Sequence, residues 1–134
     1  MKKNLLLFLS LGLLVGCKSI PKEQLITVGT GGGFAGTWQE YALKPNGEVF
    51  RHTSKPDTNT LIATLPKAVT KQLFKDIVAL DLAHKQLDEP GNMSYFVSFS
   101  EGNKFTYKVL WGGKTAPADS VKQFYKSFMQ VVNP

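Results

Sequence analysis

The clearest pattern along the chain is an alternation of apolar and polar side chains in residues 93–99 and 105–111. An apolar residue at every second position is typical of a β-strand with one buried face. The apolar positions are Met93, Tyr95, Val97 and Phe99, followed by Phe105, Tyr107, Val109 and Trp111. A short polar stretch with a glycine separates the two runs, so together they predict an antiparallel hairpin.

The length of the hairpin loop decides whether the two apolar rows share one face of the sheet. A two-residue turn at Gly102-Asn103 would pair Phe99 with Thr106 and place the rows on opposite faces. A three-residue loop pairs Phe99 with Phe105 and brings the rows together. Because strand register follows the buried face, we predict the three-residue loop, with Asn103 at a positive φ.

Two segments have the period of an amphipathic helix, with apolar residues three and four positions apart. These residues are Val69, Leu73, Phe74, Ile77 and Leu80 in the first segment and Val121, Phe124, Tyr125, Phe128 and Val132 in the second. Pro66 and Pro117 precede them, as suits the first turn of a helix. Another face of the first helix carries Lys67, Lys71 and Lys75, which we interpret as a solvated face rather than a partner site.

The N-terminal half predicts short strands at residues 25–28, 37–43 and 49–51. We expect the glycine-rich segment after residue 28 to end the first of them. Residues 53–59 are polar and contain a proline, which predicts a loop. Residues 60–65 fit either a short strand or the approach to the first helix.

A strong turn signal, Pro45-Asn46-Gly47, joins the second and third of these strands. A two-residue turn would place Leu43 opposite Phe50, whereas a three-residue loop with a left-handed glycine would place Leu43 opposite Val49. The proline favours the three-residue loop because it presets the φ angle of a type I turn.

The order of these elements is β-β-β-α-β-β-α, with residues 81–92 expected to form a loop. Hairpins predominate over βαβ units, which predicts an α+β fold. We expect a mainly antiparallel sheet of about five strands, with both helices packed on its aromatic face. One domain should cover residues 25–134.

The segment from Gly29 to Gly36 contains five glycines and one aromatic residue. Glycine suits positive φ angles and close backbone approach, but it is costly to order, so the run needs a physical reason. In one interpretation the segment is a bulged crossover in which Phe34 packs into the core. In the other it is a recognition loop, because exposed aromatic residues dominate binding hot spots and free backbone amides can pair with a partner strand. The candidate binding residues are Gly31, Gly32, Gly33, Phe34, Ala35 and Gly36.

The chain begins with two lysines and an apolar run over residues 5–15. This is the layout of a secretory signal, and the run is shorter than the roughly 20 residues of a bilayer span. It ends in Leu14-Val15-Gly16-Cys17, which resembles the lipobox of bacterial lipoproteins. The resemblance implies a signal peptide at residues 1–16, lipidation of Cys17, for example with palmitate, and a tether at residues 17–24. Lys18 in place of aspartate, by resemblance to enterobacterial lipoproteins, implies the outer membrane.

Composition adds two exclusions. The net charge is +6, but the lysines are spread along the chain, so they do not form a nucleic-acid footprint. Cys17 is the single cysteine, so no disulfide framework is expected. The domain must therefore be held together by its own hydrophobic core.

The motifs of catalysis and cofactor binding are incomplete. Gly31-x-Gly33-x-x-Gly36 matches the dinucleotide fingerprint, but a strand pattern follows it where a helix is needed. Gly113-Lys114-Thr115 looks like the end of a P-loop, but the required glycine is replaced by Lys108. We expect no cofactor.

Side chains for metal binding or general acid–base work are also scattered. The two histidines, His52 and His84, have no nearby histidine or cysteine, and we interpret both as surface residues. Asp57, Asp88 and Glu89 lie in predicted polar loops, where solvated carboxylates are common. We therefore expect no metal site and no enzyme activity.

The residues Gly32-Gly33-Phe34-Ala35-Gly36 resemble emfourin, a small protein inhibitor of thermolysin-type metallopeptidases. The segment is also similar to that of uncharacterised small lipoproteins of the Bacteroidetes. The resemblance to emfourin implies an inhibitor of a secreted or periplasmic metallopeptidase. Together with the resemblance to a lipobox, it implies a membrane-anchored binding domain of the cell envelope. The alternative is an envelope structural or assembly lipoprotein with no inhibitory role.

Overall fold

The computed structural model describes residues 20–21 and 23–133. The predicted signal peptide and the lipidation of Cys17 lie outside these residues. The elements are β1 (Gln24–Gly32), β2 (Thr37–Leu43), β3 (Glu48–Ser54), β4 (Asp57–Thr64), α1 (Lys67–Leu80), the 3-10 turn η1 (Leu82–His84), β5 (Leu87–Asp88), β6 (Met93–Glu101), β7 (Phe105–Trp111) and α2 (Asp119–Val132). Within the described residues no helix is long and apolar enough to cross a membrane.

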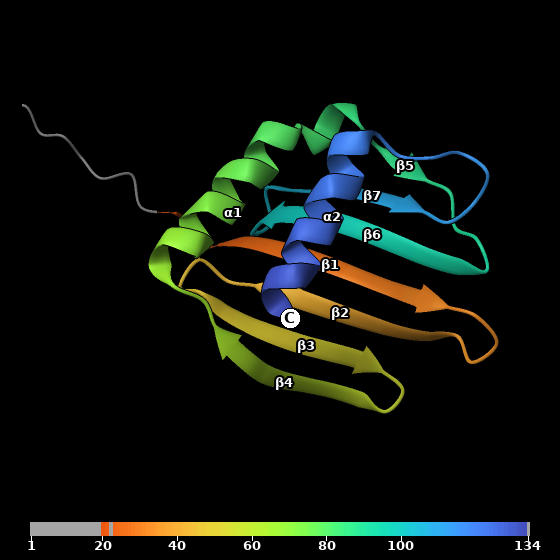
Figure 1. The fold of residues 1–134 in the computed structure, drawn as a ribbon, viewed down its shortest axis with the longest axis horizontal. Coiled ribbons are helices and arrows are strands. Elements are labelled where there is room, and N and C mark those ends of the chain that lie inside the picture. Colours follow the sequence, from red (N-terminus) through yellow and green to blue (C-terminus); the bar gives the residue numbers. More distant parts are fainter. Residues whose placement is uncertain (1–19, 22, 134) are drawn as a thin grey trace, which may run out of the picture.

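A single seven-stranded sheet has the order β4-β3-β2-β1-β6-β7-β5. All neighbouring strands are antiparallel except β5 and β7, which are parallel. Both helices pack on one face of this sheet (Figure 1). The α+β class is thus confirmed, whereas the sheet has more strands than the expected five or so. Residues 60–64, for which a short strand was one of the two alternatives, belong to β4, and β5 adds a further strand.

The β6–β7 hairpin places its two apolar rows on one face, as predicted. Val97 lies opposite Val109, and both are fully buried beneath the helices. The detailed register is wrong, because Phe99 lies opposite Tyr107 rather than Phe105. The loop has three residues, but its positive φ belongs to Gly102 rather than Asn103. Glycine has no Cβ and takes this conformation without steric cost.

The β2–β3 hairpin confirms the favoured alternative. Leu43 lies opposite Val49, and Gly47 has a φ of 92°. Lys44 donates its backbone N–H to the Glu48 carbonyl at 2.9 Å, which closes a three-residue loop. The left-handed glycine and the proline two residues before it together select this register.

Three other expectations for strands and loops are wrong. β1 continues through the first glycines to Gly32 instead of ending near Val28. Residues 53–59 are not a loop, because β3 and β4 are joined by a tight turn at Lys55–Pro56. Residues 81–92 contain η1 and the two-residue strand β5, which is too short to leave a periodic signal.

Both helices match their predicted apolar stripes. α1 buries Leu73, Phe74, Ile77 and Leu80, and Val69 is partly buried beside them. α2 buries Val121, Phe124, Phe128 and Val132, with Tyr125 partly buried. The core lies between these stripes and the inward rows of β1, β2, β6 and β7.

The course of β1 defines two ends of the sheet. We call the end where β1 begins, at Gln24, the entry end, and the end where it finishes, at Gly32, the tip end. At about 3.3 Å per residue, β1 spans about 30 Å between them. The β1–β2 turn, the β3–β4 turn and the segments 89–92 and 112–118 lie at the tip end, whereas α1 begins near the entry end (Figure 1).

Phe128 provides a test of the core. Its side chain is fully buried, so Phe128→Ala should lower the free energy of unfolding by about 3–5 kcal/mol. Val131→Ala, on the exposed side of the same helix, should change it by no more than about 0.5 kcal/mol. Urea unfolding followed by circular dichroism measures both values, and equal effects would contradict this placement of the core.

Candidate binding site

The second half of the glycine segment forms the turn between β1 and β2. Gly32 pairs with Thr37, so residues 33–36 form a four-residue loop. The φ angles of Gly32, Gly33 and Gly36 are 104°, 70° and 57°, a region that other residues avoid. The segment is therefore a hairpin turn, and the interpretation as a bulged crossover is wrong.

The first half of the segment needs glycine for a different reason, namely close approach by aromatic rings. On the sheet face opposite the helices, a Cβ on Gly31 would lie 2.3 Å from the Trp38 ring, and one on Gly29 would lie 2.6 Å from the Phe96 ring. The two ring centroids are 5.8 Å apart. Phe96 is only 2% exposed, and Lys108 Nζ lies 4.3 Å from its ring centroid. These two glycines thus let rings cover the central strand.

Most backbone hydrogen-bonding groups of the glycine segment already have partners within the chain. Gly31 and Gly32 lie in β1, which pairs with β2 on one side and with β6 on the other. Gly33 donates its N–H to the Asn92 carbonyl, and Gly36 donates to the Gly33 carbonyl at 3.2 Å. The idea that these amides are free to pair with a partner strand is therefore wrong.

Phe34 lies at the apex of this turn and is completely exposed, with a relative accessibility of 113%. The interpretation in which Phe34 packs into the core is therefore wrong. Its neighbour Ala35 is also exposed, and Met93, which is 43% exposed, has its Sδ beside Gly33. We call Phe34, Ala35 and Met93 the tip surface.

Contacts from neighbouring loops hold the turn in place. Lys55, from the β3–β4 turn, donates its Nζ–H to the Ala35 carbonyl at 3.1 Å. On the other side, the Gly33–Asn92 hydrogen bond joins the turn to the segment before β6. Sequence reasoning missed Lys55 and Asn92 because both lie far from the turn in the chain.

A second pair of loops at the tip end is joined by Glu89. Its Oε1 accepts hydrogen bonds from the backbone N–H of Lys114 at 2.7 Å and of Thr115 at 2.9 Å. The pKa of Glu89 is lowered mainly by a hydrogen bond from the Thr115 side chain, and to a smaller extent by one from the Thr115 backbone. Thus the amides of Lys114 and Thr115 bind the Glu89 carboxylate, and the Gly113 N–H donates to the Glu89 backbone carbonyl at 3.0 Å. Glu89 therefore has a structural role that its sequence position did not indicate.

The three loop carboxylates considered for acid–base work do not meet. Asp57 begins β4 at one edge of the sheet, whereas Asp88 and Glu89 lie at β5 on the opposite edge. Asp57 instead contacts His52 Nε2 at 2.8 Å, and Glu40 lies 3.7 Å from the other ring nitrogen. Asp57 is therefore separated from Asp88 and Glu89 by the full width of the sheet.

The other histidine has a comparable local partner. His84 Nδ1 lies 2.8 Å from Asp81 Oδ2, and both side chains are largely exposed. Asp81 follows α1 with a left-handed φ of 55°. Among residues 20–21 and 23–133, no three His, Cys, Asp or Glu side chains are grouped so as to hold a metal ion.

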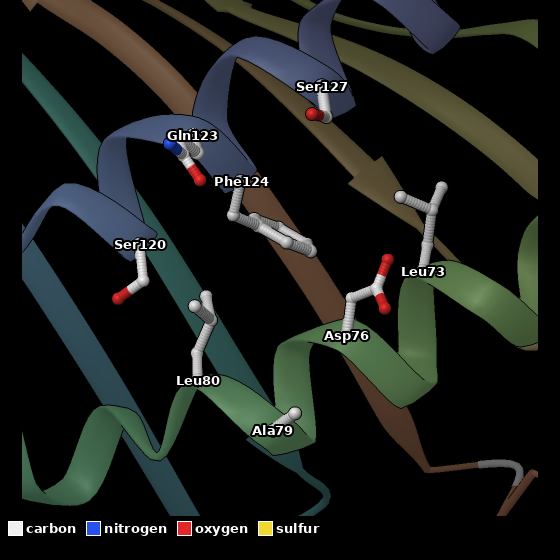
Figure 2. Close-up of a pocket in the computed structure, with 8 residues that line it drawn as sticks. All are labelled: Leu73, Asp76, Ala79, Leu80, Ser120, Gln123, Phe124 and Ser127. Atoms are coloured by element: carbon white, nitrogen blue, oxygen red, sulfur yellow. The ribbon is translucent and has the colours of Figure 1, made fainter.

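A groove of about 300 Å³ lies between the two helices (Figure 2). Its lining residues are Leu73, Asp76, Ala79, Leu80, Ser120, Gln123, Phe124 and Ser127. The Phe124 ring points across it toward α1, and Asp76, the one ionisable group in the lining, accepts a hydrogen bond from Gln72 at 2.7 Å. The groove offers no pair of groups for proton transfer, so the tip surface remains the stronger candidate.

The Glu89 contacts predict a pH dependence of stability. When folding lowers the pKa of a carboxyl group, the ionised group stabilises the folded state at pH values above its ordinary pKa of 4.5. This stabilisation disappears as the pH falls through the lowered pKa of the folded state. Glu89→Gln should therefore reduce the free energy of unfolding at neutral pH, and the difference from the parent chain should shrink in acid. Denaturant unfolding across pH measures this, with Asp88→Asn as the control. A difference independent of pH would contradict the assignment.

The chain matches no protein-family model, and no curated protein is similar enough to count as a match. Any functional assignment must therefore be argued from the geometry of the chain's own residues.

Proposed function

We propose that this chain is a lipid-anchored binding domain of the cell envelope, on the outer membrane, and that its tip surface inhibits a thermolysin-type metallopeptidase. The observation that carries the proposal is the complete exposure of Phe34 at the apex of a hairpin turn. The free energy falls when an aromatic ring leaves water and enters a partner's apolar pocket. This is the behaviour of a binding hot spot.

The fixed shape of the turn supports the same proposal. Hydrogen bonds from Lys55 and to Asn92 hold the turn on both sides. A loop that is already ordered loses little conformational entropy when it binds. Phe34 can therefore contribute most of its burial energy to affinity.

Inhibition would follow from occupation of the cleft, with no chemistry by this chain. Gly33 and Gly36 have left-handed backbones, so the turn does not present an extended peptide of the kind that pairs along a binding cleft. The turn would fill the cleft and exclude substrate without being aligned for cleavage. The resemblance of Gly32–Gly36 to emfourin motivates the choice of peptidase class.

The position of the tip also suits an anchored binder. Gln24, the last residue of the predicted tether, begins β1 at the entry end, whereas Phe34 lies beyond the other end of β1. β1 would place the ring about 30 Å from the anchored end. A secreted or periplasmic partner could then reach the tip surface without contacting the membrane.

Phe34→Ala tests the binding role. Because the ring is fully exposed, the free energy of unfolding should change by no more than about 0.5 kcal/mol. Inhibition should weaken by at least about 30-fold, the loss expected for a hot spot of 2 kcal/mol. Titration of peptidase activity against a fluorogenic peptide measures the inhibition constant.

Leu61→Ala is the matched control for Phe34→Ala. Leu61 is another exposed apolar residue, at 50%, but it lies in β4, away from the tip. It should leave inhibition unchanged. Failure of the parent chain to slow any secreted or periplasmic metallopeptidase of its own organism at stoichiometric amounts would refute the inhibitor proposal.

One observation favours the alternative role in envelope assembly. β4 is an eight-residue edge strand that pairs only with β3, and most of its residues are exposed. Such an edge can accept a strand from a partner. Recovery from membranes of a stable complex that survives Phe34→Ala but is lost when β4 is altered would favour an assembly lipoprotein.

The lipid anchor has its own test. Cells grown with labelled palmitate should label the parent chain, and Cys17→Ala should abolish the label because its thiol is the acceptor. Ser19→Ala should retain it. Mass spectrometry of the purified chain should find an N-terminus at residue 17, and an unmodified chain that still begins at Met1 would contradict the lipoprotein assignment.

A further inference from the structure

One flank of α1 carries a row of lysines. Lys67, Lys71 and Lys75 are four residues apart and all are exposed, and Val78, which is 59% exposed, lies on the same flank. The first turn of α1 contains no acidic residue. Within the part of the chain that the structure describes, no carboxylate lies within ion-pair distance of these three lysines.

This lysine flank meets the start of the described chain. A groove at the entry end is lined by Ile20, Pro21, Gln24, Lys71, Phe74, Lys75 and Val78. The flank faces away from α2, whose groove is lined by other α1 residues. In Figure 1 the described chain begins beside α1, at the end of the sheet opposite the β1–β2 turn.

The distance from the proposed anchor to this flank is short. Cys17 lies three residues before Ile20, which is a reach of at most about 11 Å. The Debye length at physiological ionic strength is about 8 Å. Attachment at Cys17 would therefore keep the start of the described chain at a distance from the membrane comparable to the Debye length, so charged headgroups can attract the lysine flank beside it. The sequence between Cys17 and β1 adds two lysines, Lys18 and Lys22.

We infer that the lysine flank of α1 docks on anionic lipid headgroups of the membrane that carries the anchor. The inference rests on the proposed anchoring and adds an orientation to it. Each lysine near an anionic surface favours docking by about fivefold, so three favour it by on the order of 100-fold. Val78 adds apolar contact at the interface.

Docking would fix which part of the domain faces the partner. α1 lies at the entry end and the tip surface lies at the other end of β1. With the lysine flank on headgroups, the strands project away from the membrane and Phe34 points outward. A tether alone would let the domain rotate.

The experiment uses the full chain reconstituted in vesicles of phosphatidylcholine alone or of phosphatidylcholine mixed with phosphatidylglycerol. An environment-sensitive fluorophore is attached through Val78→Cys or, as the control position, Ala35→Cys. Neutral acrylamide then measures the exposure of the fluorophore to water. We expect several-fold less quenching at position 78 in the anionic vesicles than in the neutral ones, reversed by high salt, and no difference at position 35.

Two double variants distinguish the effect of the lysine flank on docking from the effect of net charge. Lys71→Glu with Lys75→Glu should abolish the protection at position 78. Lys122→Glu with Lys126→Glu changes net charge equally at the same spacing on α2 and should retain it. Equal quenching at position 78 in both vesicle types, or equal effects of the two double variants, would overturn the inference and leave the flank as a solvated face.

The anchor and the docking can fail separately in this design. A lipidated Cys17 has no free thiol, so one fluorophore per chain is expected at the introduced cysteine. A second fluorophore per chain would show that Cys17 is unmodified, which would refute the proposed anchoring on which the inference rests. Inhibition of a peptidase in detergent, without vesicles, should be unaffected by the α1 charge variant. Loss of protection with intact lipidation and intact inhibition would therefore refute docking alone.

Discussion

The centre of this fold depends on the absence of side chains at Gly29 and Gly31. A Cβ at either position would lie within 2.6 Å of the ring of Phe96 or Trp38. With glycine, both rings lie against β1 and shield the middle of a sheet face that no helix covers. The same strand then continues to Gly32, where positive φ angles begin and the chain reverses. One run of glycines therefore meets two unrelated requirements, close packing in the strand and backbone freedom in the turn.

The parts of the fold that could be predicted are those in which a local pattern and the buried face agree. The two helices and the shared face of β6 and β7 follow from apolar periodicity alone. The β2–β3 register follows from Pro45 and Gly47, whose φ preferences act within the turn itself. In each case the information lies within a few residues of the feature that it determines.

The errors arise where pairing or tertiary contacts, rather than the apolar pattern of the segment itself, decide the structure. β4 is mostly polar and exposed, and it forms because β3 offers a hydrogen-bonding edge rather than because its own pattern is apolar. β5 is a two-residue pairing with β7. At the candidate site, the sequence indicates the glycine segment, but the exposure of Phe34 and the contacts of Lys55 and Asn92 depend on tertiary placement. The role of Glu89 likewise requires a loop that is 25 residues away.

The free edge of β4 affects how copies of this chain anchored in one membrane can associate. A long, weakly charged edge invites another copy to add to the sheet, and the symmetric way to do so is antiparallel. β4 runs from the tip end to the entry end, so an antiparallel pair would have its two entry ends pointing in opposite directions. Two chains held by their entry ends in one bilayer cannot meet in this way. Common orientation would thus protect an edge that has few charges of its own against edge-to-edge aggregation.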